Sequence, residues 1–286
     1  MKIPQVLVLG ATGRIGGILR KLWSQGPDQA PFQVRWQARR EPITGPVTGQ
    51  GPWVVFDPLK DPDALAHAAR DTAAILCLAG VVPGRGGNMD DNAALAGAAI
   101  RAGAASGARV LLASSAAVYG AQSGMLSEAA PLIPVNAYGQ AKADMERRAA
   151  QLARDLGVRV TALRIGNIAG IDAILGGWRP GFELDRFADG RTPRRSYIGP
   201  VTLARVLGDL LEVKTLPDVL NVASPGPVEM GALLDAAGLG WVARPAPQTA
   251  IAGVALSTDA LARFTTLPEA SPADLVAQWR KMTKAQ

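Results

Sequence analysis

Near the start of the chain, four apolar residues run directly into a cluster of glycines, in the stretch VLVLGATGRIGG. The apolar run Val6–Leu9 predicts a buried strand. Gly10, Gly13 and Gly16 follow it at a spacing of three and open a helix. A strand, a glycine turn and a helix in this order let the backbone approach a pyrophosphate, which then lies against the N–H groups of the helix N-terminus. This stretch therefore predicts a dinucleotide-binding unit.

Short apolar segments alternate with helical ones over the first 170 residues. We expect strands at Val6–Leu9, Phe32–Ala38, Trp53–Phe56, Ala73–Leu78, Val110–Ala113 and Val158–Leu163, and helices at Ile15–Trp23, Pro62–Arg70, Asn92–Ala105 and Ala137–Leu156. The apolar runs are continuous and do not alternate with polar residues, which is typical of parallel strands covered on both faces. The expected fold class is α/β, a Rossmann-type doubly wound parallel sheet.

After Gly170 the pattern loosens into stretches rich in Gly, Pro and Arg, such as GGWRPGF and GRTPRRSYIGP. These predict a small C-terminal substrate-binding lobe. We therefore expect residues 1–170 to form the NADP-binding domain, residues 195–224 to return to it, and residues 171–286 to belong mainly to the lobe.

Composition excludes several other classes of protein. No apolar run reaches the roughly 18 residues of a membrane span, and glycines, not a cleavage site, follow the short apolar start. A single cysteine, Cys77, predicts a reducing, cytoplasmic location, and together with one histidine it leaves little for a metal site. The net charge of +6 is scattered along the chain, which favours an anionic cofactor or substrate over nucleic acid.

The end of the second expected strand bears on which dinucleotide is bound. NAD-binding sites usually carry an Asp or Glu there for the ribose hydroxyls. Here the stretch reads WQARR, with Arg39 and Arg40 and no carboxylate before Glu41. Guanidinium groups suit the 2′-phosphate of NADP, and Arg14 in the glycine turn is placed to approach the same phosphate. NADP is therefore favoured, and NAD is the alternative. The interpretation without a function is that Arg39 and Arg40 are two solvated arginines at the end of a strand.

A second stretch carries groups suited to proton transfer. Tyr138 and Lys142 are four residues apart, so on a helix they share one face, and Ser115 ends the fifth expected strand. A lysine cation favours the phenolate form of a tyrosine, and a serine hydroxyl can hold a substrate oxygen. Together the three side chains can move a proton at a hydroxyl while a hydride moves at carbon.

These motifs, in this order, resemble the extended short-chain dehydrogenase/reductase superfamily, also called the NAD-dependent epimerase/dehydratase family. The matching stretches are GATGRIGG, CLAGV, SSAAVYG, AYGQAK and LRIGNIAG, which cover roughly residues 5 to 170. The resemblance implies that Tyr138 is the catalytic acid/base, that Lys142 holds the nicotinamide ribose and lowers the pKa of the tyrosine, and that Ser115 polarises the substrate. It also implies a homodimer formed through the helices 92–105 and 137–156.

The resemblance further assigns residues to the cofactor and the substrate. Asp57 with Pro58 resembles the adenine-contacting segment, and Asn92 resembles the asparagine that heads the following helix, where a helix N-cap is the structural alternative. Asn167 and Arg195 are expected to contact substrate, Arg195 at its diphosphate, with a solvated loop charge as the alternative for Arg195. The expected cofactor contacts are Gly10, Thr12, Gly13, Arg14, Ile15, Gly16, Arg39, Arg40, Asp57, Pro58, Leu78, Ala79, Gly80, Tyr138, Lys142 and Ile165.

Two departures from the family pattern concern the substrate. Residues 199–202 read Gly-Pro-Val-Thr where the family usually has His-Val-Asp-Asp, and the substrate region is short for a sugar-nucleotide epimerase. The expected function is an NAD(P)-dependent oxidoreductase of the epimerase/dehydratase type, with NADP-linked reduction as the first reading. The alternatives are a nucleotide-sugar epimerase with tightly bound NAD and a non-catalytic NADP sensor. Ala116 and Ala117 beside Ser115 argue against a dehydratase, which would want an acid/base pair there.

Overall fold

The computed structural model describes residues 5–23, 32–41, 51–84 and 86–283. The chain divides into two compact units, each made of several segments. The first unit comprises Met1–Ser115, Asn136–Leu163 and Leu207–Leu220, and the second comprises Ala116–Val135, Arg164–Val206 and Asn221–Gln286.

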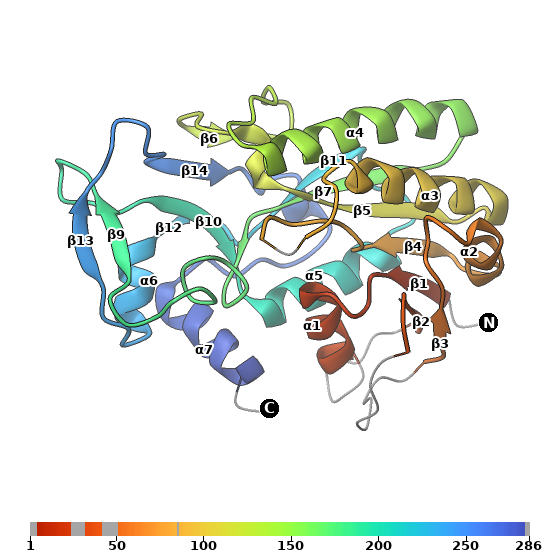
Figure 1. Ribbon diagram of the computed structural model, residues 1–286, viewed down its shortest axis with the longest axis horizontal. Helices are drawn as coiled ribbons and strands as arrows, with labels where there is room; N and C mark the ends of the chain where they lie inside the picture. The colour runs from red at the N-terminus through yellow and green to blue at the C-terminus, as the bar shows by residue number, and fades with distance from the viewer. Residues whose placement is uncertain (1–4, 24–31, 42–50, 85, 284–286) are drawn as a thin grey trace. The chain divides into compact units, whose positions relative to one another are not determined.

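A seven-stranded sheet is the framework of the first unit (Figure 1). Its strands are β1 (Gln5–Leu9), β2 (Gln33–Ala38), β3 (Trp53–Val55), β4 (Ala74–Cys77), β5 (Arg109–Ser115), β7 (Val160–Ile165) and β11 (Val219–Val222). Their order is β3-β2-β1-β4-β5-β7-β11, and β1 pairs in parallel with both β2 and β4. The strand order reverses between β1 and β4, the point where ligands bind in sheets of this kind. The predicted doubly wound α/β fold is confirmed.

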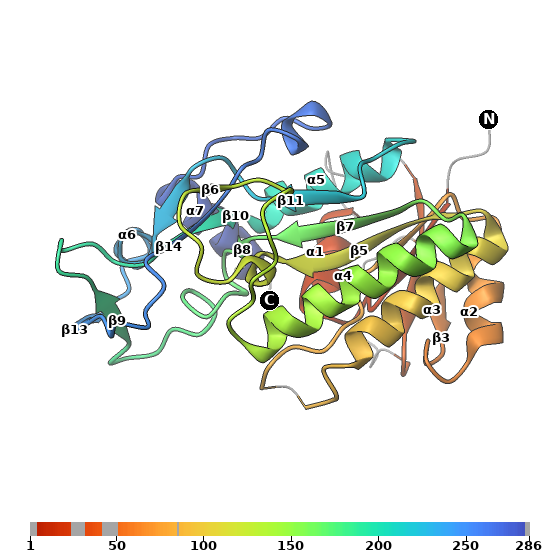
Figure 2. The same ribbon diagram turned by 90° about the horizontal axis from the view of Figure 1, so that it is seen from above.

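Helices cover both faces of this sheet (Figures 1 and 2). Helix α1 (Arg14–Trp23) lies on one face, and α3 (Asp91–Ser106) and α4 (Ala137–Leu156) lie side by side on the other, with α2 (Pro62–Ala69) against α3. Helix α3 approaches the sheet closely because it is made of small residues. At Gly103 an added Cβ would lie 2.8 Å from both the Ala108 carbonyl oxygen and a Val110 methyl group.

The expected elements match the observed ones within two residues, with two informative differences. The strand expected at Val158–Leu163 is β7, Val160–Ile165, because Gly157 adopts a φ of +65° and the Val158 N–H still donates to the Ala153 carbonyl oxygen at 3.0 Å. This bond completes the C-terminal turn of α4 and delays the strand. The N-cap interpretation of Asn92 is wrong, because α3 begins at Asp91 and Asp90 occupies its cap position.

The second unit holds a five-stranded sheet and a two-stranded one. The larger sheet runs β12 (Pro227–Glu229), β10 (Arg194–Ile198), β14 (Gly253–Leu256) and β6 (Met125–Leu126), with β8 (Asn167–Ile168) paired to β10. The smaller one joins β9 (Glu183–Arg186) to β13 (Val242–Pro245), and the helices are α5 (Pro200–Glu212), which ends in the first unit, α6 (Met230–Ala236) and α7 (Pro272–Thr283). Tyr197, Val228 and Leu233 are among the residues of its apolar core.

A buried polar network stabilises the second unit around Tyr119, which lies in the short 3₁₀ helix Ala116–Tyr119. The Tyr119 hydroxyl donates to the Asn221 side-chain oxygen at 2.7 Å and accepts from an Arg164 nitrogen at 2.8 Å. Tyr119 is fully buried, which identifies it as a structural residue.

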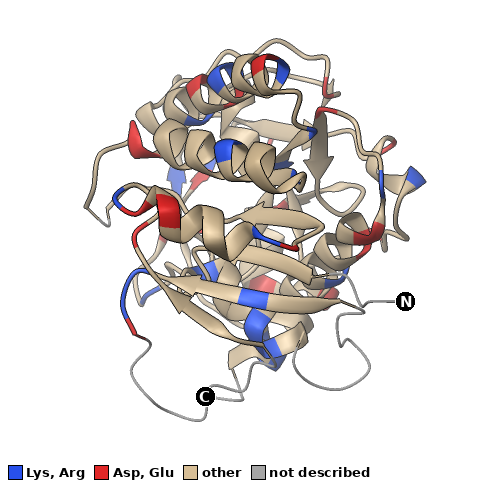
Figure 3. Ribbon diagram, turned by 90° about the vertical axis from the view of Figure 1, so that its right-hand side faces the viewer, with Lys and Arg blue, Asp and Glu red and all other residues tan. Residues whose placement is uncertain are grey.

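Charged residues of both signs occur along the same helices in the view of Figure 3. Among the helices of the described ranges, none combines the length and the hydrophobicity that a membrane span requires.

Candidate active site

Close contacts between backbone atoms require glycine in the turn after β1. Gly10 has a φ of +78°, and a Cβ there would lie 2.7 Å from the Ala79 nitrogen. A Cβ on Gly16 would lie 2.4 Å from the Ala11 carbonyl oxygen. Only glycine fits both positions, and helix α1 begins at once, so its first N–H groups have no acceptor within the helix. Such a turn can receive a pyrophosphate, as the sequence predicts.

Two side chains that the sequence analysis did not single out hold this turn in place. The side-chain oxygen of Gln37 in β2 accepts from the Gly10 N–H at 2.9 Å, and its nitrogen donates to the Phe56 carbonyl oxygen at 2.6 Å. Arg20 donates from Nε to the Ala11 carbonyl oxygen at 3.1 Å. Gln37 is 1% exposed, and an amide among the buried residues at the carboxyl end of β2 is the signal that points to it.

The residues expected at the adenosine end surround the carboxyl ends of β2 and β3. Arg39 and Arg40 directly follow β2 and are exposed. Asp57 follows β3, and its Oδ1 accepts from the Leu59 N–H at 3.0 Å, so the carboxylate already shapes its own turn. Pro58 is buried beside it.

The segment after β4 passes close to the expected catalytic lysine. A Cβ on Gly80 would lie 2.7 Å from the Asn92 side-chain oxygen and 3.3 Å from Lys142 Nζ. Asn92 is 1% exposed and holds the segment through its amide, which bonds both the N–H and the carbonyl oxygen of Val81 at 3.2 Å. Leu78, Ala79 and Gly80 are thus fixed between the glycine turn and Lys142.

Lys142 is buried, with 5% of its surface exposed. Its Nζ donates to the Ala113 carbonyl oxygen at 2.8 Å. Burial lowers the pKa of Lys142 from its usual 10.5 to about 8, and the nearby Cys77 and Glu146 act in the opposite direction. Its proton is therefore held less firmly than that of a surface lysine.

Tyr138 lies one helical turn before Lys142 in α4, as the spacing predicts. The Lys142 nitrogen is 6.0 Å from the centre of the tyrosine ring. Burial raises the pKa of the Tyr138 phenol, while a hydrogen bond from Ser115 and the charge of Arg14 counteract the increase. Lys142 is not among these causes, so its expected effect on the tyrosine pKa stays a prediction.

Glu146, which the sequence analysis missed, is the second buried charged residue of α4. It is 7% exposed, lies one turn beyond Lys142, and accepts a hydrogen bond from the Ser114 hydroxyl. Ser114 directly precedes Ser115, so this bond fixes the end of β5 against α4. The spacing Tyr138, Lys142, Glu146, four residues each, is the signal that identifies a third side chain on this helix face.

The burial of Lys142 predicts a pH dependence of stability. Its folded-state pKa near 8 lies below the unfolded value of 10.5, so between these values the unfolded chain binds more protons. The free energy of unfolding should therefore contain a part that rises from pH 8 to pH 10.5 and is lost as pH falls through 8. Denaturant unfolding of the wild type and of Lys142→Met across this window tests it. The difference between the two curves should grow with pH, and a constant difference would contradict the prediction.

Of the residues expected at the substrate, Ser115 belongs to the first unit, whereas Asn167 and Arg195 belong to the second, where two unpredicted side chains join them. The Tyr197 hydroxyl donates to Asp172 Oδ2 at 3.0 Å and is also hydrogen-bonded to the Asn167 side chain. Burial raises the pKa of both Tyr197 and Asp172. Ile165 is buried at the end of β7. The Asn167 side chain is thus held by the buried pair of Tyr197 and Asp172.

Arg195 is a strand residue and not a loop residue. It lies half-buried in β10, and its guanidinium donates to the Arg194 carbonyl oxygen at 2.8 Å. Burial lowers its pKa. The alternative of solvated loop charges for Arg194 and Arg195 is therefore wrong.

Fold and site together define a class of protein. These are the dinucleotide-binding enzymes that carry a serine, a tyrosine and a lysine at the carboxyl ends of the strands of a parallel sheet. The glycine turn, with no room for a Cβ at Gly10 or Gly16, fits a pyrophosphate-bearing cofactor. Residues 6–174 match the NAD dependent epimerase/dehydratase family, and the chain belongs to that family. The resemblance predicted from the motifs is confirmed.

Individual relatives agree with this assignment. UDP-glucose 4-epimerase of Azospirillum brasilense is 33% identical over 183 residues, which are 59% of this chain and 50% of the relative. The chain thus spans about half the length of the curated relative it matches.

Solved structures share the fold at low sequence identity. UDP-glucose 4-epimerase from Brucella ovis in complex with NAD superposes with a TM-score of 0.78 at 19% identity, covering 96% of both chains. The NAD-dependent NDP-hexosamine 5,6-dehydratase TunA gives 0.77 at 19% identity, covering 100% of this chain and 99% of that one. An epimerase and a dehydratase match almost equally well, so the fold alone does not separate the two activities.

Proposed function

We propose that this chain is an NAD(P)-dependent oxidoreductase of the epimerase/dehydratase type that acts at a carbon bearing a hydroxyl or carbonyl group. The observation that carries the proposal is the hydrogen bond between Ser115 and Tyr138 beside the buried Lys142. Three polar side chains converge there, which is the arrangement that acid/base chemistry at a substrate oxygen requires.

Each residue has a distinct part in this proposal. Ser115 holds the substrate oxygen by a hydrogen bond, and Tyr138 gives or takes the proton at that oxygen. Lys142, fixed by the Ala113 carbonyl, orients the ribose of the cofactor and adds positive charge beside the phenol. The nicotinamide of the bound cofactor supplies or accepts the hydride. Backbone groups of the glycine turn and of residues 78–80 supply the remaining contacts to the cofactor in this proposal.

NADP is the cofactor we propose, on the strength of Arg39 and Arg40. Both are exposed at the carboxyl end of β2, and the first carboxylate after that strand is Glu41. Guanidinium groups pair with a phosphate through charge-assisted hydrogen bonds, whereas they offer nothing comparable to two ribose hydroxyls. Net reduction with NADPH is therefore the proposed direction.

Titration of the purified chain with NADPH and NADH tests this choice. NADPH should bind at least about tenfold more tightly, and Arg39→Ala/Arg40→Ala should remove the difference, because each hydrogen bond to a charged group contributes about 1.5–3 kcal/mol. Arg70→Ala, at an exposed arginine of the same unit, serves as the control and should keep the preference. Equal binding of both nucleotides by the wild type would contradict NADP specificity.

The second candidate is a nucleotide-sugar epimerase that retains NAD. The curated match to a UDP-glucose 4-epimerase favours it, and so does the strand position of Arg195, which suits a substrate diphosphate. Denaturing the purified protein and analysing the released nucleotide separates the two candidates. Stoichiometric NAD released from fresh protein, with turnover of UDP-glucose in the absence of added cofactor, would replace the reductase proposal by the epimerase.

A homodimer and a cytoplasmic location complete the proposal. The dimer would form through α3 and α4, and sedimentation velocity showing only monomer at micromolar concentration would contradict it. The single cysteine, Cys77, is buried, and burial raises its pKa to about 11, which suits a reducing compartment and an unreactive thiol.

A further inference from the structure

Arg194 and Arg195 are neighbours on β10, so their side chains leave opposite faces of the sheet. The Arg195 face is shared by Tyr197 and by Val228, its partner on β12, which belong to the apolar core of the second unit. The Arg194 side chain lines a cavity of about 460 Å³ within the same unit. The two arginines therefore face different surroundings.

The cavity has mostly apolar walls. A loop of residues 121–125, the segment 250–255 and Pro227 line it together with Arg194. Met125 and Ile251 give it apolar surface, and Arg194 is the one charged residue among its described lining residues. Its volume lies in the range of about 300–1,000 Å³ that small-molecule sites occupy.

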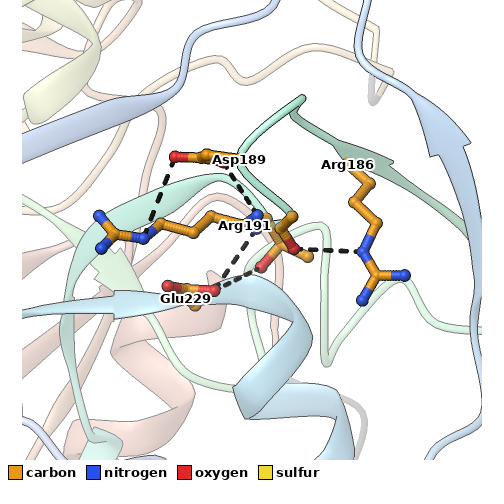
Figure 4. Close-up of polar contacts among 6 residues, drawn as sticks. Arg186, Asp189, Arg191 and Glu229 are labelled. Atoms are coloured by element: carbon orange, nitrogen blue, oxygen red, sulfur yellow. Dashed lines mark hydrogen bonds and ion pairs between the residues drawn. The ribbon is translucent and has the colours of Figure 1, made fainter.

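Two carboxylates of this part of the chain, Glu229 and Asp189, are engaged with residues other than Arg194, as Figure 4 shows. Glu229 lies directly opposite Arg194 in the antiparallel pair of β10 and β12, on the same face. Its Oε2 instead accepts from the N–H and the hydroxyl of Thr192, at 3.4 and 3.5 Å. Asp189 accepts from the Arg191 N–H at 3.0 Å and lies 4.0 Å from its Nε.

The guanidinium of Arg194 consequently forms no ion pair with either of these carboxylates. Within the described ranges, no hydrogen bond or ion pair joins its side chain to another residue. A half-buried cation in an apolar hollow favours an anionic group brought in by a ligand. A carboxylate matches the planar fork of a guanidinium, and an apolar body matches the rest of the wall.

We propose that this cavity binds a small organic carboxylate, with Arg194 pairing with the carboxylate and Met125 and Ile251 contacting its apolar body. The site is separate from the acid/base residues and from Arg195, so it stands whether or not the proposed reaction is correct. It is a second binding site of the chain, for a different class of ligand.

Methionine-methyl NMR of the full chain tests the site, since Met125 lines the cavity and is 62% exposed. Its signal is assigned with Met125→Leu. Hexanoate should shift this signal in a saturable way, and the neutral hexanamide should bind at least about tenfold more weakly. Arg194→Gln should weaken hexanoate binding by a similar factor, while Arg191→Gln, at an exposed arginine nearby, should bind like the wild type.

The outcomes separate the proposal from its alternatives. Equal affinity for hexanoate and hexanamide in the wild type would overturn it, and this comparison needs no variant to fold. Undiminished binding by Arg194→Gln would overturn it as well. Inorganic phosphate is the third probe. Weak competition by phosphate supports a carboxylate site, whereas phosphate binding more tightly than hexanoate would overturn the carboxylate assignment.

Discussion

Tyr138→Phe should lower turnover by about 10²- to 10⁴-fold, the range that a positioned acid/base group contributes. The substitution removes only the hydroxyl oxygen, so the ring beside Lys142 and the fold should remain. Cofactor affinity should change by no more than a few-fold. The measurement is the change in reduced nicotinamide absorbance with NADPH and a panel of carbonyl compounds, and product analysis with UDP-glucose.

Gln140→Ala is the matched control for this substitution. Gln140 lies in the same helix, is exposed, and bonds only the neighbouring Asp144 among described residues, so its loss should change turnover less than twofold. Turnover by Tyr138→Phe close to that of the wild type would remove the tyrosine from the mechanism. A chain that binds NADPH but turns over none of these substrates would favour the non-catalytic sensor instead.

Gly10→Ala should lower the stability of the chain strongly. The added methyl group would lie 2.7 Å from the Ala79 nitrogen and 2.8 Å from its Cα, and the φ of +78° is itself unfavourable for alanine. Backbone atoms cannot move aside as a side chain does, so we expect a loss of about 2–4 kcal/mol in the free energy of unfolding. Denaturant unfolding measures it, and nucleotide affinity should fall in parallel.

Gly17→Ala provides the contrasting case seven residues away. Its Cβ would meet only the end of the Arg20 side chain, at 4.0 Å, and the residue lies inside α1. Alanine in a helix is favoured over glycine by up to about 1 kcal/mol, so this variant should be as stable as the wild type or more so. Equal losses at both positions would mean that the contact with Ala79 does not set the cost at Gly10.

The strands and the glycine turn could be predicted from the sequence, because continuous apolar runs mark buried strands and glycines mark positions where the backbone leaves no room for a side chain. Continuous apolar runs identified the parallel strands, and Gly10 and Gly16 proved to be positions with no room for a Cβ. The spacing of Tyr138 and Lys142 placed both on one helix face. The family assignment followed from these same stretches and is confirmed by the match over residues 6–174.

The sequence pattern could not identify the supporting side chains, because their hydrogen-bond partners are distant in the chain. Gln37 bonds Gly10 across 27 positions, and the partner of Glu146 is Ser114, 32 positions away. The pKa of Tyr138 likewise depends on how strongly burial acts against a charge from another helix. The roles assigned to the site residues and the boundaries of the substrate lobe stay predictions.

Helix α4 is fastened to β5 at two successive turns, through Lys142 to the Ala113 carbonyl and through Glu146 to Ser114. Ser115 is the next residue after these two anchor points. The helix can therefore neither slide along the strand nor rotate about its axis without breaking a buried polar bond. Its solvent-facing residues, such as Gln151, Arg154 and Asp155, are thereby decoupled from the geometry at Ser115 and Tyr138. The outer face of α4 could therefore be redesigned for solubility or for a different assembly without changing the geometry at Ser115 and Tyr138.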